Sequence, residues 1–332
     1  MTFRILWPLM RWDDDRSIER DALGEGFEPQ FAAHFEEISD DDWARCDAIV
    51  SYVDIPRESR AKLERCKIFV TPKVGFDNID LAAWDELGIP VCNVPDYGTM
   101  EVADHAIALM LTLMKGTHLH TERLRGDLIG HWEPTLNPFG KRLSDCTFGV
   151  VGLGRIGTAA ALRAKAFGMK VLFVDPFVSN GVDLALGVER LRSLSEMASR
   201  CDVLSVHAPL CKGTRNLVDG TALERASDLV LVNTARGEVV DLDALYSALK
   251  DGRVRAAGLD VLPVEPPKQS HPLLDAFTAD EEWIRHRLVL TPHSAFFTPE
   301  SARDMRAKGT EVAVRFLRDG ILENVVDAEK GG

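Results

Sequence analysis

The sequence has 332 residues, of which 45% are hydrophobic and 27% charged, a composition typical of folded globular domains and not of disordered chains. The net charge of −13 leaves no basic field for a nucleic-acid backbone, so we expect no nucleic-acid partner. No stretch approaches the roughly 20 apolar residues that span a bilayer, and the apolar run at residues 5–10 is too short for a signal peptide, so we expect a cytoplasmic protein without a membrane partner.

The first 93 residues alternate between short apolar runs and helical patterns. Strands are predicted at residues 5–7, 31–35, 48–52, 68–70 and 90–92, and helices at residues 18–23, 41–45, 58–65 and 81–87. Strands that alternate with helices indicate a parallel sheet covered on both faces. The turn at residues 73–78 follows a predicted strand, so its N–H groups could face a ligand, although a plain connecting turn fits equally well.

A long helical pattern follows at residues 101–124, and a loop or arm is predicted at residues 126–143. The helix carries His105, His118 and His120, which we interpret as packing or surface histidines because no acidic ligands accompany them at metal spacing. The six cysteines are scattered without a C-x-x-C pair. We therefore expect neither a metal site nor a disulfide framework.

The stretch at residues 147–175 predicts a dinucleotide site. An apolar strand leads into the pattern G-x-G-x-x-G at residues 152–157, a helix follows, and a second strand ends on Asp175. Gly152 permits the tight turn, Gly154 lets the backbone approach the pyrophosphate, and Gly157 lets the helix pack close to the strand. The pyrophosphate would bind at the N-terminus of the helix. A structural turn without a ligand is the alternative.

Asp175 indicates which dinucleotide binds. It follows Gly157 by 18 residues, close to the roughly 20 expected for the acid that accepts hydrogen bonds from the ribose hydroxyls. Its charge would repel a 2′-phosphate, and no arginine follows within residues 176–180. The sequence therefore favours NAD over NADP.

The same alternation continues to the end of the chain. Strands are predicted at residues 203–206, 229–232, 256–259 and 288–290, and a helix at residues 242–250 with Asp241 as its cap. A last helix starts at Pro299, after the cap Thr298, and runs to about residue 317.

Three titratable residues, Arg236, Glu265 and His293, fall just after predicted strands of this second part. Ligands bind outside the carboxyl ends of parallel strands, so the three should lie at one edge with the glycine turn. Arg236 offers a planar fork for a carboxylate, and His293 can exchange a proton near neutral pH. Glu265 would orient the imidazole and favour its charged form. Together they suit the reduction of a 2-keto acid.

Each of these residues also has a plain alternative. Arg236 could form a surface ion pair, Glu265 could be a solvated acid, and His293 could be a core histidine. Their expected position at one edge of the sheet favours a shared catalytic site over these alternatives.

The motifs at residues 233–237, 258–261, 265–266 and 291–295, with the glycine fingerprint, resemble the D-isomer-specific 2-hydroxyacid dehydrogenase family over nearly the whole chain. Residues 155–167, 171–176 and 181–187 are most similar to its C-terminal-binding-protein branch, which contains eukaryotic transcriptional corepressors and bacterial dehydrogenase-like proteins. The resemblance implies an α/β protein of two doubly wound parallel-sheet domains. A flavodoxin-like substrate domain would comprise residues 1–98 and 297–332, and a Rossmann NAD domain, residues 99–296, would be inserted in it.

The resemblance also implies site residues. Arg236, Glu265 and His293 match the catalytic arginine, acid and histidine, and Val74 and Gly75 match a backbone cradle for the substrate carboxylate. Matches to NAD contacts are Val151, Gly152, Leu153, Gly154, Arg155, Ile156, Asp175, Ala208, Pro209, Thr214, Thr234, Ala235, Arg236, Asp260, His293 and Ala295.

Other pocket residues follow less directly. Tyr52, Trp132 and Phe296 are candidate walls of a small, partly apolar substrate pocket. Glu265 stands where formate dehydrogenases carry glutamine, which argues against formate as substrate. Between Leu274 and Leu288 the chain is longer than usual for the family, and we expect a surface excursion near the catalytic edge.

We thus expect an NAD-dependent D-2-hydroxyacid dehydrogenase, working as a reductase of small 2-keto acids and forming a homodimer. The alternative is an NADH-sensing dimeric scaffold like the corepressors. The catalytic residues are present in both kinds of protein and do not separate them.

Overall fold

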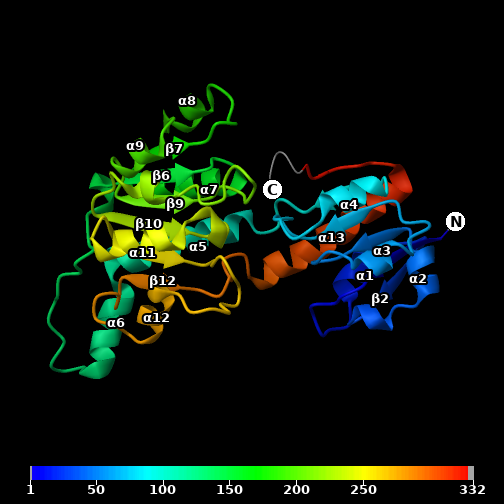
Figure 1. Ribbon diagram of the computed structural model, residues 1–332, viewed down its shortest axis with the longest axis horizontal. Helices are drawn as coiled ribbons and strands as arrows, with labels where there is room; N and C mark the ends of the chain where they lie inside the picture. The colour runs from blue at the N-terminus through cyan, green and yellow to red at the C-terminus, as the bar shows by residue number, and fades with distance from the viewer. Residues whose placement is uncertain (1, 328–332) are drawn as a thin grey trace. The chain divides into compact units, whose positions relative to one another are not determined.

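The computed structural model describes residues 2–327, and residue 1 and residues 328–332 lie outside the described part. The chain divides into two compact units (Figure 1): unit 1 holds residues 1–98 and 297–332, and unit 2 holds residues 99–296. Each unit contains one parallel sheet with a buried apolar cluster on each face. The predicted α/β class, with two parallel sheets, is confirmed.

Unit 1 has five parallel strands in the order β2-β1-β3-β4-β5. They are β1 (Phe3–Trp7), β2 (Phe27–Phe31), β3 (Ala48–Val50), β4 (Phe69–Thr71) and β5 (Val91–Asn93). Its helical elements are α1 (Ser17–Leu23), η1 (Phe35–Glu37), α2 (Asp40–Arg45), α3 (Arg57–Arg60), α4 (Leu81–Glu86) and α13 (Pro299–Asp319). The order 2-1-3-4-5 is that of flavodoxin-like sheets, as predicted.

Two predictions in unit 1 were wrong in position or length. The second strand was expected at residues 31–35 but lies at Phe27–Phe31, where it pairs in parallel with β1. The strand includes Pro29, and β2 is at the sheet edge, where the missing N–H of a proline is tolerated. The helix expected at residues 58–65 is only the single turn α3.

Unit 2 has seven parallel strands in the order β12-β11-β10-β9-β6-β7-β8. They are β6 (Thr147–Val151), β7 (Lys170–Val174), β8 (Glu189–Leu191), β9 (Val203–Val206), β10 (Leu229–Asn233), β11 (Val254–Leu259) and β12 (Leu288–Leu290). The helical elements are α5 (Thr99–Lys115), α6 (Thr117–Gly126), η2 (Leu143–Asp145), α7 (Arg155–Ala166), α8 (Val182–Leu186), α9 (Leu194–Ala198), α10 (Gly220–Leu223), η3 (Gly237–Val239), α11 (Leu242–Lys250) and α12 (Pro272–Thr278). Strand order reverses at β6, as in a Rossmann sheet.

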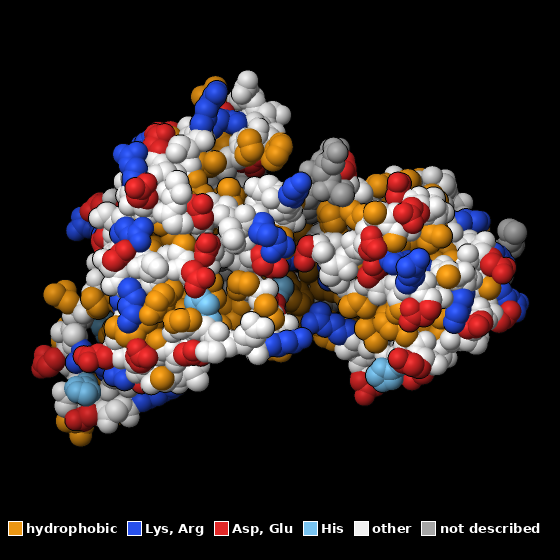
Figure 2. All heavy atoms as spheres, viewed as in Figure 1, with side chains coloured by type: hydrophobic (Ala, Val, Ile, Leu, Met, Phe, Trp, Pro, Cys, Tyr) orange, Lys and Arg blue, Asp and Glu red, His pale blue; other side chains and the backbone are white. Residues whose placement is uncertain are grey.

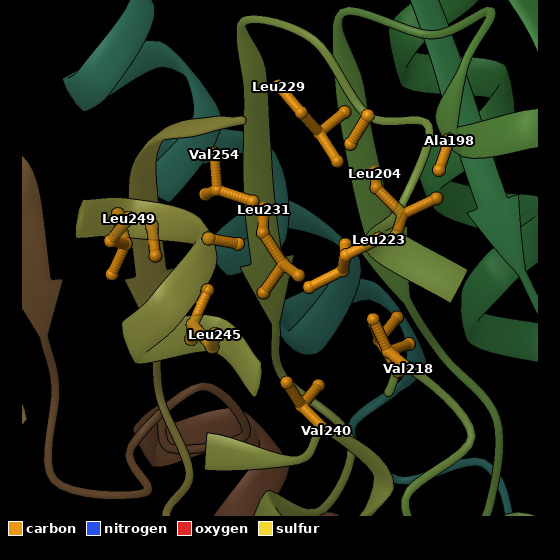
Figure 3. Close-up of a cluster of buried hydrophobic side chains, with 14 of the residues drawn as sticks. Ala198, Leu204, Val218, Leu223, Leu229, Leu231, Val240, Leu245, Leu249 and Val254 are labelled. Atoms are coloured by element: carbon orange, nitrogen blue, oxygen red, sulfur yellow. The ribbon is translucent and has the colours of Figure 1, made fainter. Parts of the chain in front are cut away.

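The central strands of unit 2 are buried on both faces. Figure 3 shows one of the two cores, to which Leu229 and Leu231 of β10 and Leu245 and Leu249 of α11 belong. The alternate residues of β10 belong to the core on the other face, with α5 and α7. This arrangement explains why β10 reads as an unbroken apolar run, because a strand covered on both faces has no solvent side.

The long helix expected at residues 101–124 is two helices, α5 and α6, separated at Gly116. Gly116 has φ +63°, a conformation that favours glycine, and a Cβ there would lie 2.7 Å from the Asn137 side chain. Asn137 Nδ2 donates to the carbonyl oxygens of Leu113 and Met114, both at 3.0 Å. The amide thus satisfies carbonyls at the end of α5, and the helical pattern alone did not reveal this break.

The segment expected as a surface excursion near the catalytic edge packs elsewhere. Trp283 contacts Tyr246 of α11, with ring centroids 5.8 Å apart, and the Lys250 ammonium lies 3.7 Å from its ring. Arg287 Nη2 donates to the carbonyls of Leu249 and Val254, at the end of α11 and the beginning of β11. The segment is at the surface, as expected, with residues 277–282 exposed, but it leads to the amino ends of the strands and not to the catalytic edge.

Acidic and basic side chains are interspersed over the face drawn in Figure 2. Many form exposed ion pairs, such as Arg45 with Asp41 at 2.8 Å, which add little to stability because solvent screens the two charges. Among the helices of residues 2–327, none has the length and apolar character that crossing a bilayer requires.

Candidate functional site

The ends of five strands in unit 2 form one row across the sheet. Leu290, Leu259 and Asn233, the last residues of β12, β11 and β10, are partners in register. Asn233 is in turn the partner of Val206, and Val206 of Val151, the residues that end β9 and β6. The segments that carry His293, Glu265, Arg236 and the glycine turn therefore leave the sheet at the same edge, as the sequence predicted.

His293 and Glu265 form a direct pair at this edge. His293 Nδ1 lies 2.6 Å from Glu265 Oε2, and both side chains are partly exposed, at 40% and 34%. Because an ionised carboxylate only accepts hydrogen bonds, the imidazole proton in this contact is on Nδ1. Nε2 is then the nitrogen that can exchange a proton with a bound molecule.

The carboxyl group of Glu265 is kept in its ionised form. Partial burial by itself would raise its pKa, but hydrogen bonds from His293 and from the Leu262 N–H (2.8 Å), with the positive charges of His293 and Arg236, outweigh that effect. The net result is a pKa below the ordinary value for glutamate. Glu265 is thus an ionised acceptor for the Nδ1–H of His293.

The turn that presents Arg236 is fixed by Asn233, which is 1% exposed. Its Nδ2 donates to the Arg236 carbonyl (2.9 Å), and its Oδ1 accepts from the Ala235 N–H (3.0 Å). A Cβ on Gly237 would lie 1.9 Å from the carbonyl carbon of Leu262. Only glycine therefore lets this turn pack against the loop that leads to Glu265.

His293 sits in a left-handed conformation with φ +50°, which is uncommon for a residue other than glycine. Asp260 holds this turn, since its carbonyl accepts from the His293 N–H (2.8 Å) and its carboxylate accepts from the N–H groups of Ser294 (2.9 Å) and Ala295 (3.0 Å). The Phe296 ring packs edge-on against the imidazole, with centroids 6.2 Å apart. Phe296 therefore borders His293, and its role as a pocket wall stays a prediction.

The glycine turn has the geometry that its pattern predicts. Gly152 has φ +88°, and a Cβ there would lie 2.9 Å from the Ala208 nitrogen; a Cβ on Gly157 would lie 2.0 Å from the Gly152 oxygen. Gly154 has open space around its Cβ position, and no side chain caps α7, which begins at Arg155. The first N–H groups of α7 are therefore available to an anion.

Buried polar atoms near this edge fit a dinucleotide. Within residues 2–327, Thr234 Oγ1 and His207 Nδ1 are buried without a hydrogen-bond partner. Asp175 accepts from the N–H groups of Leu153 and Phe177, both at 2.8 Å, which orients its carboxylate and leaves further lone pairs for ribose hydroxyls. His207 was not among the predicted cofactor contacts. Its position directly after β9 and beside Ala208 could have indicated it as one.

The other predicted cofactor contacts lie in the same loops. Val151 ends β6, Leu153 lies in the glycine turn, and Arg155 and Ile156 begin α7. In the loop after β9, Thr214 Oγ1 donates to the carbonyl of Pro209 and accepts from the Cys211 N–H (2.5 and 2.8 Å). This hydroxyl closes the loop that begins at Ala208.

Three of the predicted substrate residues belong to unit 1. Tyr52 follows β3 and is 9% exposed; its hydroxyl accepts from Trp12 Nε1 at 3.4 Å, and burial raises its pKa. The loop after β4 is held by Asn93, whose Nδ2 donates to the Val74 carbonyl (2.7 Å). In the part of the chain that the structure describes, the N–H groups of Val74 and Gly75 donate no hydrogen bond. They remain available to a carboxylate.

Trp132 gains no support as a pocket wall. It is 71% exposed, on the segment between α6 and Asn137. That segment is attached at the ends of α5 and α6, and His118 of α6 contacts the carbonyl of His286 just before β12 begins. These attachments place the segment at the amino edge of the sheet, opposite His293.

His105 of α5 was expected to be a packing or surface histidine. It is partly buried, and its Nε2 lies 2.9 Å from Thr291 Oγ1, directly before the His293 turn, a contact that the sequence analysis did not anticipate. A signal was available, because His105 shares a helix face with the buried Val102 and Leu109, where a polar group needs a partner. In residues 2–327 no cluster of three potential metal ligands occurs.

Comparisons with known proteins agree with this geometry. Residues 107–295 match the profile of the D-isomer specific 2-hydroxyacid dehydrogenase, NAD binding domain. The chain is 38% identical to D-3-phosphoglycerate dehydrogenase of Methanocaldococcus jannaschii over 278 residues, which cover 82% of this chain and 50% of that protein. It is 35% identical to C-terminal-binding protein 1 of Caenorhabditis elegans over 260 residues, which cover 76% of this chain and 34% of that protein.

A solved structure covers both units. The fold is similar to that of an NADPH-dependent glyoxylate/hydroxypyruvate reductase from Sinorhizobium meliloti, with a TM-score of 0.84, 28% identity and 98% of each chain covered. The matched part of the chain spans half or less of the length of the two sequence relatives.

Proposed function

The chain belongs to the D-isomer specific 2-hydroxyacid dehydrogenase family, and from this premise we propose that it is an NAD-dependent D-2-hydroxyacid dehydrogenase working as a 2-keto acid reductase. The observation that carries the proposal is the 2.6 Å contact between His293 and Glu265, at the sheet edge that also carries Arg236 and the glycine turn. An acid, its orienting carboxylate and a guanidinium are the groups that carbonyl reduction needs from the protein.

Each residue has a defined task in the proposed reaction. The glycine turn and Asp175 would hold NADH, which would supply the hydride. Arg236 binds the substrate carboxylate and polarises the carbonyl with its planar fork. His293 gives a proton from Nε2 to the carbonyl oxygen, while Nδ1–H stays bonded to Glu265. In the direction of oxidation, Nε2 takes the proton back.

We propose that unit 1 contributes to substrate binding through its backbone. The N–H groups of Val74 and Gly75, which donate to no other described group, would bind the substrate carboxylate. Tyr52, in the same unit, is a further proposed apolar contact for the substrate.

A survey of substrates tests the proposal. NADH oxidation is measured with glyoxylate, hydroxypyruvate, pyruvate and bulkier 2-keto acids. Turnover on at least one of them supports the dehydrogenase. No turnover on any, together with NADH-dependent dimerisation, would instead support the second candidate, an NADH-sensing scaffold, which the similarity to C-terminal-binding protein 1 favours.

We further propose that Asp175 selects NADH over NADPH. A 2′-phosphate would meet a carboxylate whose orientation is fixed by two backbone N–H groups, and such like-charge contacts cost several kcal/mol. The expected preference for NADH in kcat/KM is about 10²-fold or more. Asp175→Asn should reduce it to about 10-fold or less.

The control is Asp145→Asn, which removes an exposed charge from the turn before β6 and should leave the preference unchanged. Equal use of both cofactors by the wild-type protein would refute the role of Asp175. The NADPH dependence of the Sinorhizobium reductase shows that a protein of this fold can have the opposite preference.

A homodimer and a cytoplasmic location stay predictions. The segment after α6 exposes Leu128, Ile129, Trp132 and Leu136, at 60%, 89%, 71% and 92%. Contiguous exposed apolar side chains are typical of protein interfaces. Sedimentation equilibrium tests the dimer, and a monomer at micromolar concentration would contradict it.

A further inference from the structure

A hydrogen-bond chain connects helix α5 to the turn that carries His293. His105 Nε2 lies 2.9 Å from Thr291 Oγ1, and Thr291 Oγ1 lies 2.5 Å from Asp260 Oδ1. The Asp260 carboxylate then accepts from the N–H groups of Ser294 and Ala295. These hydrogen bonds thus link residues that are distant in the sequence: His105 and Thr291 are 186 positions apart, and Thr291 and Asp260 are 31 positions apart.

The direction of the hydrogen bonds follows from counting protons. The Thr291 hydroxyl has one proton, and an ionised Asp260 can only accept, so this proton lies between Oγ1 and Oδ1. Thr291 Oγ1 must then accept from His105, which requires a proton on His105 Nε2. Each group in the chain therefore donates toward the carboxylate.

The carboxylate of Asp260 needs a fixed orientation to accept hydrogen bonds from the turn that carries His293. Its Oδ1 accepts from the Ser294 N–H and its Oδ2 from the Ala295 N–H, so a rotation of the group would break both contacts. The side chain is 1% exposed, and water cannot easily replace a lost donor. Thr291 is the side-chain donor that fixes Oδ1, and His105 fixes Thr291.

We propose that Thr291 and His105 are positioning residues, which act through Asp260 to hold His293 in its left-handed turn. This inference rests on the proposed role of His293 as acid and base. Holding a reacting group in place matters because a displacement of about 1 Å can lower a rate about 10²-fold. Neither residue donates its proton to the substrate in this scheme.

The test compares two variants at each position. Thr291→Val keeps the shape and removes the hydroxyl, and Thr291→Ser keeps the hydroxyl. His105→Phe removes the Nε2 donor, and His105→Gln keeps an N–H near that place. We expect kcat to fall about 10-fold or more in Thr291→Val and His105→Phe, with the KM for the keto acid changed less than about 3-fold. Thr291→Ser and His105→Gln should retain most of the wild-type kcat.

A double variant separates this chain from general structural damage. If both residues act through Asp260, Thr291→Val with His105→Phe should lose little more than the worse single variant, whereas independent effects would multiply. Thr278→Val is the matched control, because that hydroxyl bonds only to the Leu274 carbonyl of α12 and should leave kcat unchanged.

Hydrogen exchange gives a readout that needs no substrate. Thr291→Val should speed amide exchange in the peptide spanning residues 288–297, and Thr291→Ser should not. Unchanged exchange and a kcat within about 2-fold of wild type in Thr291→Val would overturn the inference, as would a Thr291→Ser variant as impaired as Thr291→Val. Wild-type protein without turnover on any keto acid would instead refute the proposed function. Amide hydrogen exchange would then still decide whether the hydrogen bonds of His105, Thr291 and Asp260 hold the turn of His293.

Discussion

Replacing His293 with alanine is expected to lower keto acid reduction about 10²–10⁴-fold while NADH still binds. A positioned general acid contributes a rate factor of this size, and the variant has no group to protonate the carbonyl oxygen. NADH binding should persist because the glycine turn, Asp175 and the buried Thr234 hydroxyl are untouched. Steady-state turnover and the fluorescence of bound NADH measure the two quantities separately.

The control for this variant is His131→Ala, which removes an exposed histidine from the segment after α6. It should leave turnover within about 2-fold of wild type. Undiminished turnover in His293→Ala would rule out the proposed acid. A loss of NADH binding equal to the loss of turnover would show that His293 acts on the cofactor and not on the substrate.

Replacing Arg306 with leucine is expected to lower the free energy of unfolding by about 3–5 kcal/mol. Arg306 of α13 is 5% exposed; its Nε and Nη2 each donate to Glu19 of α1 at 2.6 Å, and Nη1 and Nη2 donate to Asp14 at 2.5 and 3.0 Å. Glu19 is 2% exposed, so the variant would leave a buried carboxylate without its partner. Urea unfolding followed by tryptophan fluorescence measures the effect.

Two further variants identify the cause. Arg303→Leu, at an exposed position of the same helix, should change stability by less than about 0.5 kcal/mol. Adding Glu19→Leu to Arg306→Leu should recover part of the loss, because the unpaired charge is then gone. A double variant as unstable as Arg306→Leu alone would mean that lost packing, and not the unpaired charge, is responsible.

The network also predicts a pH dependence. Hydrogen bonding to Arg306 holds the pKa of Asp14 well below its ordinary value. A group whose pKa is lowered by folding stabilises the protein above the pKa of the unfolded state, and this contribution is lost as pH falls toward the folded pKa. The stability difference between wild type and Arg306→Leu should therefore shrink in acid.

Much of the site was predictable because its signals are local. The glycine pattern and the acid at the end of the next strand lie together within residues 152–175, and the motif from Asn233 to Gly237 is five consecutive residues. The positions of Arg236, Glu265 and His293 directly after strands placed them at one edge, because the carboxyl ends of parallel strands share an edge. The sequence pattern and the parallel topology together were sufficient to place these residues at one edge of the sheet.

Two of the failures share a different cause. The end of α5 at Gly116 depends on Asn137, and the position of Trp283 depends on α11; the contact of His105 with Thr291, which was not anticipated, is of the same kind. Each of these contacts joins residues far apart in the chain. Periodicity reports which face of an element is apolar, but it does not report which distant polar group will satisfy a carbonyl or an imidazole.

The sequence by itself determined the two parallel sheets, the glycine turn and the choice of the three residues that we propose as reactive groups. These follow from apolar periodicity, from the backbone freedom of glycine and from side-chain chemistry. Only the tertiary structure decided that Glu265 meets Nδ1 of His293 and that Asp260, held by Thr291, sets the turn of His293. Such contacts form only after the sheet has brought β10, β11 and β12 side by side, since no local pattern fixes the distance between loops that leave different strands.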